Sequence, residues 1–178
     1  MNNTIEKIYT FKLPRWQQLP EQPLRSSQLV QYVTEQLRAI FIDKEEIITT
    51  TMIQNYVKWG IIPRPDGKKY CKEHIAKLIV VIILKKVLHI RYIKKGMELQ
   101  LNIMDIATGY DRFCEYLEEK LQLTFRSIYF NKPYELGKIF SSDEEVGLNA
   151  LAYSFALNLL ANIIISQKGF KNIGGSHG

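Results

Sequence analysis

Three polar residues of this chain, Thr51, Gln54 and Asn55, lie close together in a short segment that also carries Lys58. At about 100° per residue, a helix over residues 52–59 turns these side chains away from its apolar side. Gln and Asn can form two hydrogen bonds with an adenine edge, and Thr can contact a thymine methyl group or a phosphate. The segment therefore predicts a helix that reads bases in the major groove, with Lys58 neutralising a phosphate.

A basic turn follows this helix. Asp66-Gly67 is a strong turn signal, and Arg64, Lys68 and Lys69 flank it. A ribbon beside a recognition helix can hold the flanking phosphates or enter the minor groove. We predict a small β-wing here; the alternative is a solvated hairpin with ordinary surface lysines. The residues predicted to contact DNA are Thr49, Thr50, Thr51, Gln54, Asn55, Lys58, Arg64, Lys68, Lys69 and Tyr70.

The charge of the chain supports a polyanionic partner. The net charge is +6, and the positive excess is confined to one stretch. Residues 44–95 contain 12 Lys or Arg and 4 Asp or Glu, whereas the rest of the chain contains 12 and 14. A Lys or Arg near a phosphate releases counterions, so this asymmetry suits nucleic acid. An anionic membrane surface and a solvated basic face without a partner are the alternatives.

The elements that must position these residues read as helices. Ser26-Ser27 predicts the N-cap of a helix over residues 28–42. The hydroxyls of Thr49, Thr50 and Thr51 can cap the helix over residues 52–59. Gly60 suits the position after this helix, where positive φ is common.

A central helix is predicted over residues 72–88. Its apolar run is rich in β-branched residues, but the stretch is too long for a typical strand. Glu73 lies in the first turn, where a carboxylate complements the helix dipole. A short helix over residues 90–101 is expected to follow.

The two ends of the chain show other patterns. Pro14, Pro20 and Pro23 predict an extended arm over residues 1–25. Gly109 predicts a break in the second half. After it we expect an amphipathic helix over 111–123, an irregular segment over 124–142, a long helix that opens at 141–145 and ends near Ser166, and a disordered tail over 172–178.

Residues 146–167 carry no charged side chain and are long enough to cross a bilayer. Asn149, Asn158 and Asn162 interrupt the apolar run, so we predict a helix buried by protein, with a transmembrane helix as the alternative. The apolar surplus also predicts a homodimer, because one small domain seldom hides so much. A ligand pocket lined by Tyr153, Asn158 and Asn162 is a further alternative. The N-terminus has no apolar segment typical of a signal peptide, which predicts a cytoplasmic protein.

Other chemistry finds little support in the residues. Cys71 lies among lysines, which can make a thiol redox-sensitive, but a capping or packing role is favoured; Cys114 is expected in the core. His74 is expected at the surface, and neither His74 nor His89 has ligand partners at metal spacing. We therefore predict no metal and no cofactor. No Ser-His-Asp arrangement follows from the spacing, and we predict that the protein is not an enzyme.

Two families resemble parts of this chain. The run Thr51–Pro63 and the run Lys68–Leu78 resemble MerR-type regulators, in which a recognition helix leads through Gly-Leu-Leu/Ile-Pro to a wing and a further helix. Leu13–Trp16 and Thr51–Tyr56 resemble more closely a bacterial domain-of-unknown-function family, numbered 1836, over roughly residues 11–160. Its members are taken as regulators, so the resemblance implies transcriptional control without naming a target.

The chain departs from the MerR-type pattern in several places. About forty residues precede the helix-turn-helix, whereas MerR-type chains usually begin with it. Asn55 stands where an Arg is frequent, and Cys71 stands where a Ser or Thr caps the next helix. No long dimerising coiled coil is evident after residue 100. Base preference, dimer geometry and effector class therefore do not carry over.

The sequence thus predicts a mainly α fold with a MerR-like winged helix-turn-helix, a small β-wing and a C-terminal helical region. We assign an extended arm to residues 1–25, the DNA-binding region to 26–95, a dimerisation or regulatory region to 96–170 and a disordered tail to 171–178. The expected function is sequence-specific DNA binding in transcriptional regulation, and the alternative is a protein-interaction adaptor without DNA binding. The expected partners are double-stranded DNA, a second copy of the chain and an unidentified small-molecule effector, and no membrane.

Overall fold

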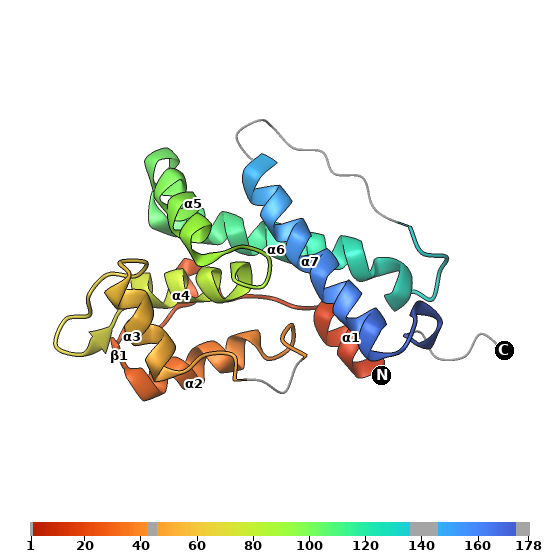
Figure 1. Ribbon diagram of the computed structural model, residues 1–178, viewed down its shortest axis with the longest axis horizontal. Helices are drawn as coiled ribbons and strands as arrows, with labels where there is room; N and C mark the ends of the chain where they lie inside the picture. Colours follow the sequence, from red (N-terminus) through yellow and green to blue (C-terminus); the bar gives the residue numbers. More distant parts are fainter. Residues whose placement is uncertain (1, 43–45, 136–145, 174–178) are drawn as a thin grey trace. The chain divides into compact units, whose positions relative to one another are not determined.

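Most of the described chain is helical, as the spacing of its apolar residues predicts. The computed structural model describes residues 2–42, 46–135 and 146–173 (Figure 1). The chain forms two compact units, which we call the central unit (residues 13–114) and the helical unit (residues 1–12 and 115–178). The sequence analysis placed domain boundaries at residues 25 and 95 according to the function expected of each segment. These boundaries stay predictions.

The central unit contains one two-stranded sheet among its helices. Its elements are η1 (Trp16–Gln18), β1 (Leu24–Arg25), α2 (Ser26–Leu37), α3 (Thr50–Lys58), β2 (Lys69–Tyr70), α4 (Lys72–Leu84), α5 (Ile90–Ile103) and the first part of α6 (Ile106–Tyr129). The strands are antiparallel, with Leu24 opposite Tyr70 and Arg25 opposite Lys69. The small sheet therefore ties the segment before α2 to the segment before α4.

α4 forms the centre of this unit, as its apolar composition predicts. Nine of its residues are buried, among them Ile75, Leu78, Ile79 and Ile82. The helix ends at Leu84 rather than at the predicted Leu88. The backbone amides of the next residues still bond to the last turn, but the chain must then turn so that His89 can cap α5.

The beginning of α2 differs from the prediction. The helix starts at Ser26, and Arg25 occupies the N-cap position that Ser26-Ser27 was expected to fill. The backbone N–H of Arg25 donates to Oε1 of Gln28 at 2.9 Å. The side chain of Gln28, inside the helix, therefore supplies the acceptor for the N-cap residue. The helix ends at Leu37, five residues before the predicted end at Ile42.

The predicted break at Gly109 was wrong, because Gly109 lies inside α6. The break falls at Asp105, whose carboxylate accepts bonds from the backbone N–H of Ala107 and Thr108, both at 3.0 Å. A Cβ at Gly109 would make only ordinary contacts, 3.6 Å from Gln100 and 3.7 Å from Met104, so neither a turn nor a close approach requires glycine here. α6 also continues to Tyr129, into the segment expected to be irregular.

The helical unit consists of α1 (Asn2–Tyr9), the remainder of α6, α7 (Val146–Ser166) and η2 (Phe170–Asn172). The extended conformation predicted for residues 1–25 was wrong over α1. Ile5 and Ile8 are buried on one side of this helix, and the prolines that suggested an extended chain lie downstream of it. The rings of Tyr9 and Tyr129 stack at 4.2 Å, which holds α1 on α6.

α7 has the length and the apolar composition of a membrane-spanning helix, and 39% of its most apolar 18-residue stretch is buried within the structure. Seven of its residues are buried, including Asn149. The predicted helix start at 141–145 and most of the predicted tail lie outside the described residues.

Candidate nucleic-acid interface

The polar face of α3 is positioned by a cap and two buried anchors. The Thr49 hydroxyl accepts a hydrogen bond from the backbone N–H of Met52 at 3.1 Å, as the sequence predicted for one of the three threonines. Ile53 and Tyr56 are fully buried and fix the helix against the unit. The opposite side of α3 exposes Thr50, Thr51, Gln54 and Lys58.

Gly60 ends this arrangement as predicted. Its φ is +64°, and the backbone N–H of Ile61 reaches the carbonyl of Tyr56 at 2.9 Å. This left-handed residue turns the chain so that Ile61 and Ile62 enter the core. Trp59, immediately before the turn, stays half exposed, although sequence reasoning did not include it among the site residues.

The basic turn is tight and well defined. Gly67 and Lys68 have φ of +50° and +65°, and the Lys69 N–H donates to the Asp66 carbonyl at 2.8 Å. Positive φ at both central residues is the signature of a type I′ turn. The turn holds the side chains of Lys68 and Lys69 in solvent.

The strand partner of this turn was not predicted. The sequence suggested two arms that meet at Asp66-Gly67, but only a single bridge joins Asp66 to Lys69. β2 pairs instead with β1, which anchors the turn to the start of α2. No local pattern could indicate this, because the partner strand lies more than forty residues away in the chain.

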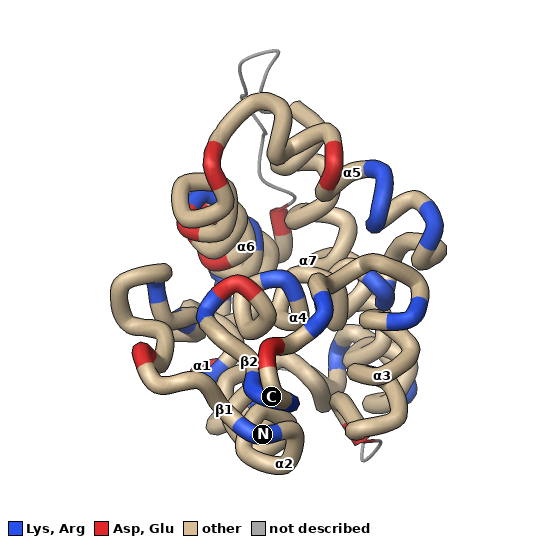
Figure 2. Tube along the Cα trace, turned by 90° about the vertical axis from the view of Figure 1, so that its left-hand side faces the viewer, with Lys and Arg blue, Asp and Glu red and all other residues tan. Residues whose placement is uncertain are grey.

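α3 and the turn lie at the same end of the central unit (Figure 1). Figure 2, which views the chain from this end, shows Lys and Arg segments along α3, β2 and the start of α4. Two of the nearby cations are neutralised, since Lys72 pairs with Glu21 and Lys77 pairs with Glu73. Within the described part of the chain, no ion pair involves the four cations Lys58, Arg64, Lys68 and Lys69.

The structure separates the predicted site residues into accessible and inaccessible ones. Tyr70 is buried, and its ring meets the edge of His74 at 5.3 Å, so its side chain is not available to a partner. Asn55 is half-buried, and the Thr49 hydroxyl is occupied by the cap. The exposed members of the predicted set are Thr50, Thr51, Gln54, Lys58, Arg64, Lys68 and Lys69.

Cys71 and His74 form a pair behind the turn. Cys71 is the N-cap of α4, and Nδ1 of His74 lies 3.1 Å from both its backbone nitrogen and its Sγ. His74 was expected at the surface but is only 5% exposed, because the first turn of α4 faces Tyr70 and the interior. Burial lowers the pKa of His74, which favours the neutral ring that accepts the Cys71 N–H.

This end of the unit lacks the groups of a metal site among the described residues. Among the described residues, no group of three His, Cys, Asp or Glu side chains could hold a metal ion. The exposed groups of the site are hydroxyls, an amide and cations, which suit hydrogen bonding and phosphate neutralisation.

A family model described as a domain of unknown function, DUF1836, matches residues 14–113. The chain belongs to the DUF1836 family. This match nearly coincides with the central unit, so the DUF1836 domain is the unit that contains α3 and the basic turn. The resemblance noted in the sequence was drawn further, to about residue 160, and the match ends within α6. No curated protein and no solved structure matches the chain.

Proposed function

We propose that the DUF1836 domain of this chain binds double-stranded DNA through α3 and the basic turn, as a MerR-like winged helix-turn-helix in transcriptional regulation. One observation carries the proposal. The exposed polar face of α3 lies at the same end of the unit as a tight turn whose lysines lack ion-pair partners among the described residues. Polar groups that can read base edges thus accompany cations that can bind phosphates.

In the proposed complex, α3 enters the major groove with its N-terminal end. Thr51 and Gln54 meet base edges, and Gln54 favours adenine. Lys58 and the turn residues Lys68 and Lys69 contact phosphates. Because β1 pairs with β2, the turn is fixed relative to α2, and both contacts form without rearrangement. The succession of α3, the basic turn and α4 is the part of the chain for which we propose the MerR-like arrangement.

Partners and location complete the proposal. The protein acts in the cytoplasm. It acts there as a homodimer, because most operators are two-fold symmetric. A small-molecule effector, whose class the site does not indicate, adjusts its activity. No catalytic activity is proposed.

A salt titration of DNA binding tests this function. We expect the chain to bind duplexes from a random pool at low salt, and log K to fall linearly with log salt concentration. The variant Lys68→Gln/Lys69→Gln should reduce the slope by about 2, since each lost phosphate contact removes about 0.9. The variant Lys68→Glu/Lys69→Glu should abolish binding.

The control is Lys7→Glu/Lys171→Glu, which makes the same charge change on two exposed lysines of the helical unit. It should retain most of the affinity. Equal loss in both charge-reversal variants, or no duplex binding by the wild type at low salt, would contradict the proposal.

A protein-interaction adaptor is the competing function. Half-exposed Trp59 beside the polar face of α3 favours it, because aromatic side chains are enriched at protein interfaces. Protein binding through Trp59 would depend weakly on salt and would be lost in Trp59→Ala. DNA binding would show the steep salt dependence described above.

A further inference from the structure

The outward side of α5 carries an apolar stripe. Tyr92, Leu99 and Ile103 are 51%, 65% and 60% exposed. At about 100° per residue these three side chains and Gly96 fall within about 60° of helix arc. A single exposed apolar residue is ordinary, but an aligned set of three is typical of a surface that binds a partner.

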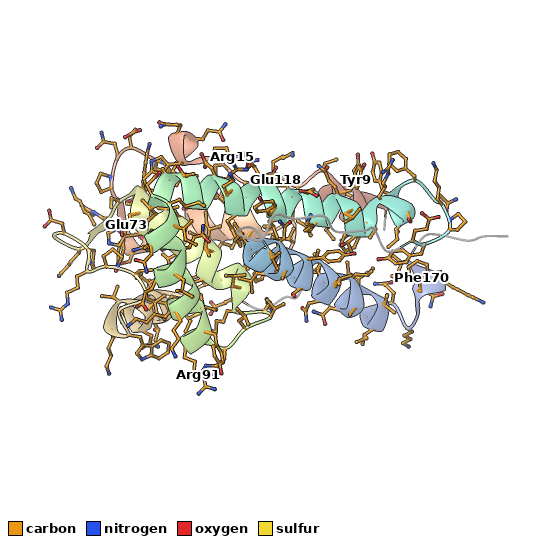
Figure 3. The ribbon with its side chains drawn as sticks, turned by 90° about the horizontal axis from the view of Figure 1, so that it is seen from above. Tyr9, Arg15, Glu73, Arg91, Glu118 and Phe170 are labelled. Carbon is orange, nitrogen blue, oxygen red and sulfur yellow. The ribbon has the colours of Figure 1, made fainter. Side chains whose placement is uncertain are left out.

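The other side of α5 contacts the central unit through a few residues, although Leu101 on that side is 44% exposed. Ile93 is buried, and Nζ of Lys94 donates to the Trp59 carbonyl at 3.1 Å. Gln100 and Met104 lie against the position of Gly109 on α6. In Figure 3, Arg91 at the start of α5 points away from the rest of the fold. The stripe is therefore held at a fixed orientation in solvent.

Gly96 lies in the middle of this stripe. Glycine is a poor helix former, and a Cβ at this position would meet no atom within 4 Å. Nothing that the structure describes within the chain therefore requires glycine here. A small residue in the centre of an exposed apolar stripe allows the backbone of another helix to approach closely.

We propose that α5 packs antiparallel against α5 of a second copy of this chain. One register satisfies the whole stripe: Tyr92 lies opposite the partner's Ile103, and Gly96 lies opposite the partner's Leu99. The sequence numbers of both pairs have the same sum, as a two-fold axis requires. Leu99 of each copy then fills the space above Gly96 of the other.

The charges beside the stripe select this direction. Lys95 and Glu98 lie on the same flank of α5, where an antiparallel arrangement brings Lys95 close to the partner's Glu98. In a parallel two-fold arrangement this flank would face the partner's opposite flank, which carries Gln100, so the pair between Lys95 and the partner's Glu98 would not form. α7, expected from sequence to close the dimer, contains no charged residue that could set a direction.

The stripe on α5 is thus the surface through which the proposed homodimer forms, whether or not the chain binds DNA. The seam is about 17 Å long from Tyr92 to Ile103. Such a short seam buries less than the roughly 1,200 Å² of a standard interface, so the dimer should be weak and its Kd micromolar.

Sedimentation equilibrium of the full chain without DNA tests the proposal. The wild type should show a reversible monomer–dimer equilibrium. Gly96→Ala should raise Kd at least about tenfold while also raising the helix stability of the monomer. Lys95→Glu should weaken the dimer, and Lys95→Glu/Glu98→Lys should restore Kd to within about twofold, because the charge pairs re-form.

Ile165→Glu is the matched control for Leu99→Glu, because Ile165 is the most exposed apolar residue of α7. Leu99→Glu should give a monomer, and Ile165→Glu should leave the dimer unchanged. The proposal is overturned by a monomer at all concentrations, by an unchanged or tighter dimer in Gly96→Ala, or by a dimer that only Ile165→Glu disrupts. A dimer that ignores duplex DNA would leave this inference standing and remove only the proposed function.

Discussion

The buried imidazole of His74 links the basic turn to the first turn of α4. Its Nδ1 accepts the Cys71 N–H, and its ring touches Tyr70 in the strand that follows the turn. The hydrogen bond from Cys71 requires an unprotonated Nδ1. The sequence analysis predicted a surface residue here. Only the packing of β2 on α4 buries it.

His74 should make the stability of the chain depend on pH. Burial lowers its pKa in the folded state, whereas the unfolded chain binds the proton near pH 6.5. Between these two values the unfolded state carries more protons, so the free energy of unfolding should decrease as the pH falls below about 6.5. Urea unfolding at about pH 5 and about pH 7.5 measures this.

The matched variant is His74→Gln. Glutamine at the third helical position can still accept the N-cap amide, as in a capping box, but it does not titrate. Its free energy of unfolding should change less over the same pH range than that of the wild type. An unchanged pH dependence would assign the effect to other groups.

At the scale of elements, capping decides where the helices begin. We expect Thr49→Val to lower the free energy of unfolding by about 1 kcal/mol, because the backbone N–H of Met52 loses its acceptor. Valine keeps the shape of threonine without the hydroxyl, so packing should change little. Chemical denaturation measures the loss.

Thr51→Val provides the control on the same helix. Thr51 is exposed, and its substitution should change stability by less than about 0.5 kcal/mol. Under the proposed function the two variants separate, because Thr51→Val should weaken the binding of a selected duplex, whereas folded Thr49→Val should bind nearly normally. Equal destabilisation by the two substitutions would contradict the capping assignment.

Helix boundaries show what local patterns can and cannot predict. The end of α3 at Gly60 follows from glycine itself, since its φ is positive. The same reasoning failed at Gly109, which lies inside α6, whereas Asp105 supplies the cap before this helix. A glycine therefore does not by itself locate the end of a helix, and the hydrogen bonds of the flanking residues show where the break falls.

At the scale of the whole molecule, the unequal exposure of side chains on α7 bears on whether this helix is buried in protein or spans a membrane. Ile163 is 5% exposed and Ile165 is 74% exposed, although both are isoleucines on the same uncharged helix. Ile163→Ala should cost roughly 2–5 kcal/mol of stability, as expected for a buried large-to-small change. Ile165→Ala should cost less than about 1 kcal/mol. Thermal or urea unfolding of the two variants without detergent measures the difference.

The membrane alternative makes the opposite prediction. A spanning α7 would require detergent or lipid to keep the chain in solution, and the two substitutions would then have similar effects. Recovery of the folded chain without detergent, together with the unequal losses, supports a helix buried in protein.

The sequence by itself determined the mainly α fold, the helical nature of α3 and α4, a threonine cap before α3, the Gly60 stop and the family of the DUF1836 domain. These features depend on residue periodicity and on contacts within a few positions, which the order of residues records directly. The tertiary structure alone decided which predicted site residues are accessible. Tyr70 and His74 are buried because α4 receives β2, and β2 is held by β1 from far earlier in the chain.

The polar face of α3 and the basic turn lie at the same end of one unit. The strand pairing that brings the turn there is not encoded by local spacing. The exposed stripe of α5 was likewise hidden in the sequence. Its apolar residues look like those of any amphipathic helix until the structure shows which of them face solvent. Burial depends on contacts between distant segments, and for that reason only the folded chain could reveal it.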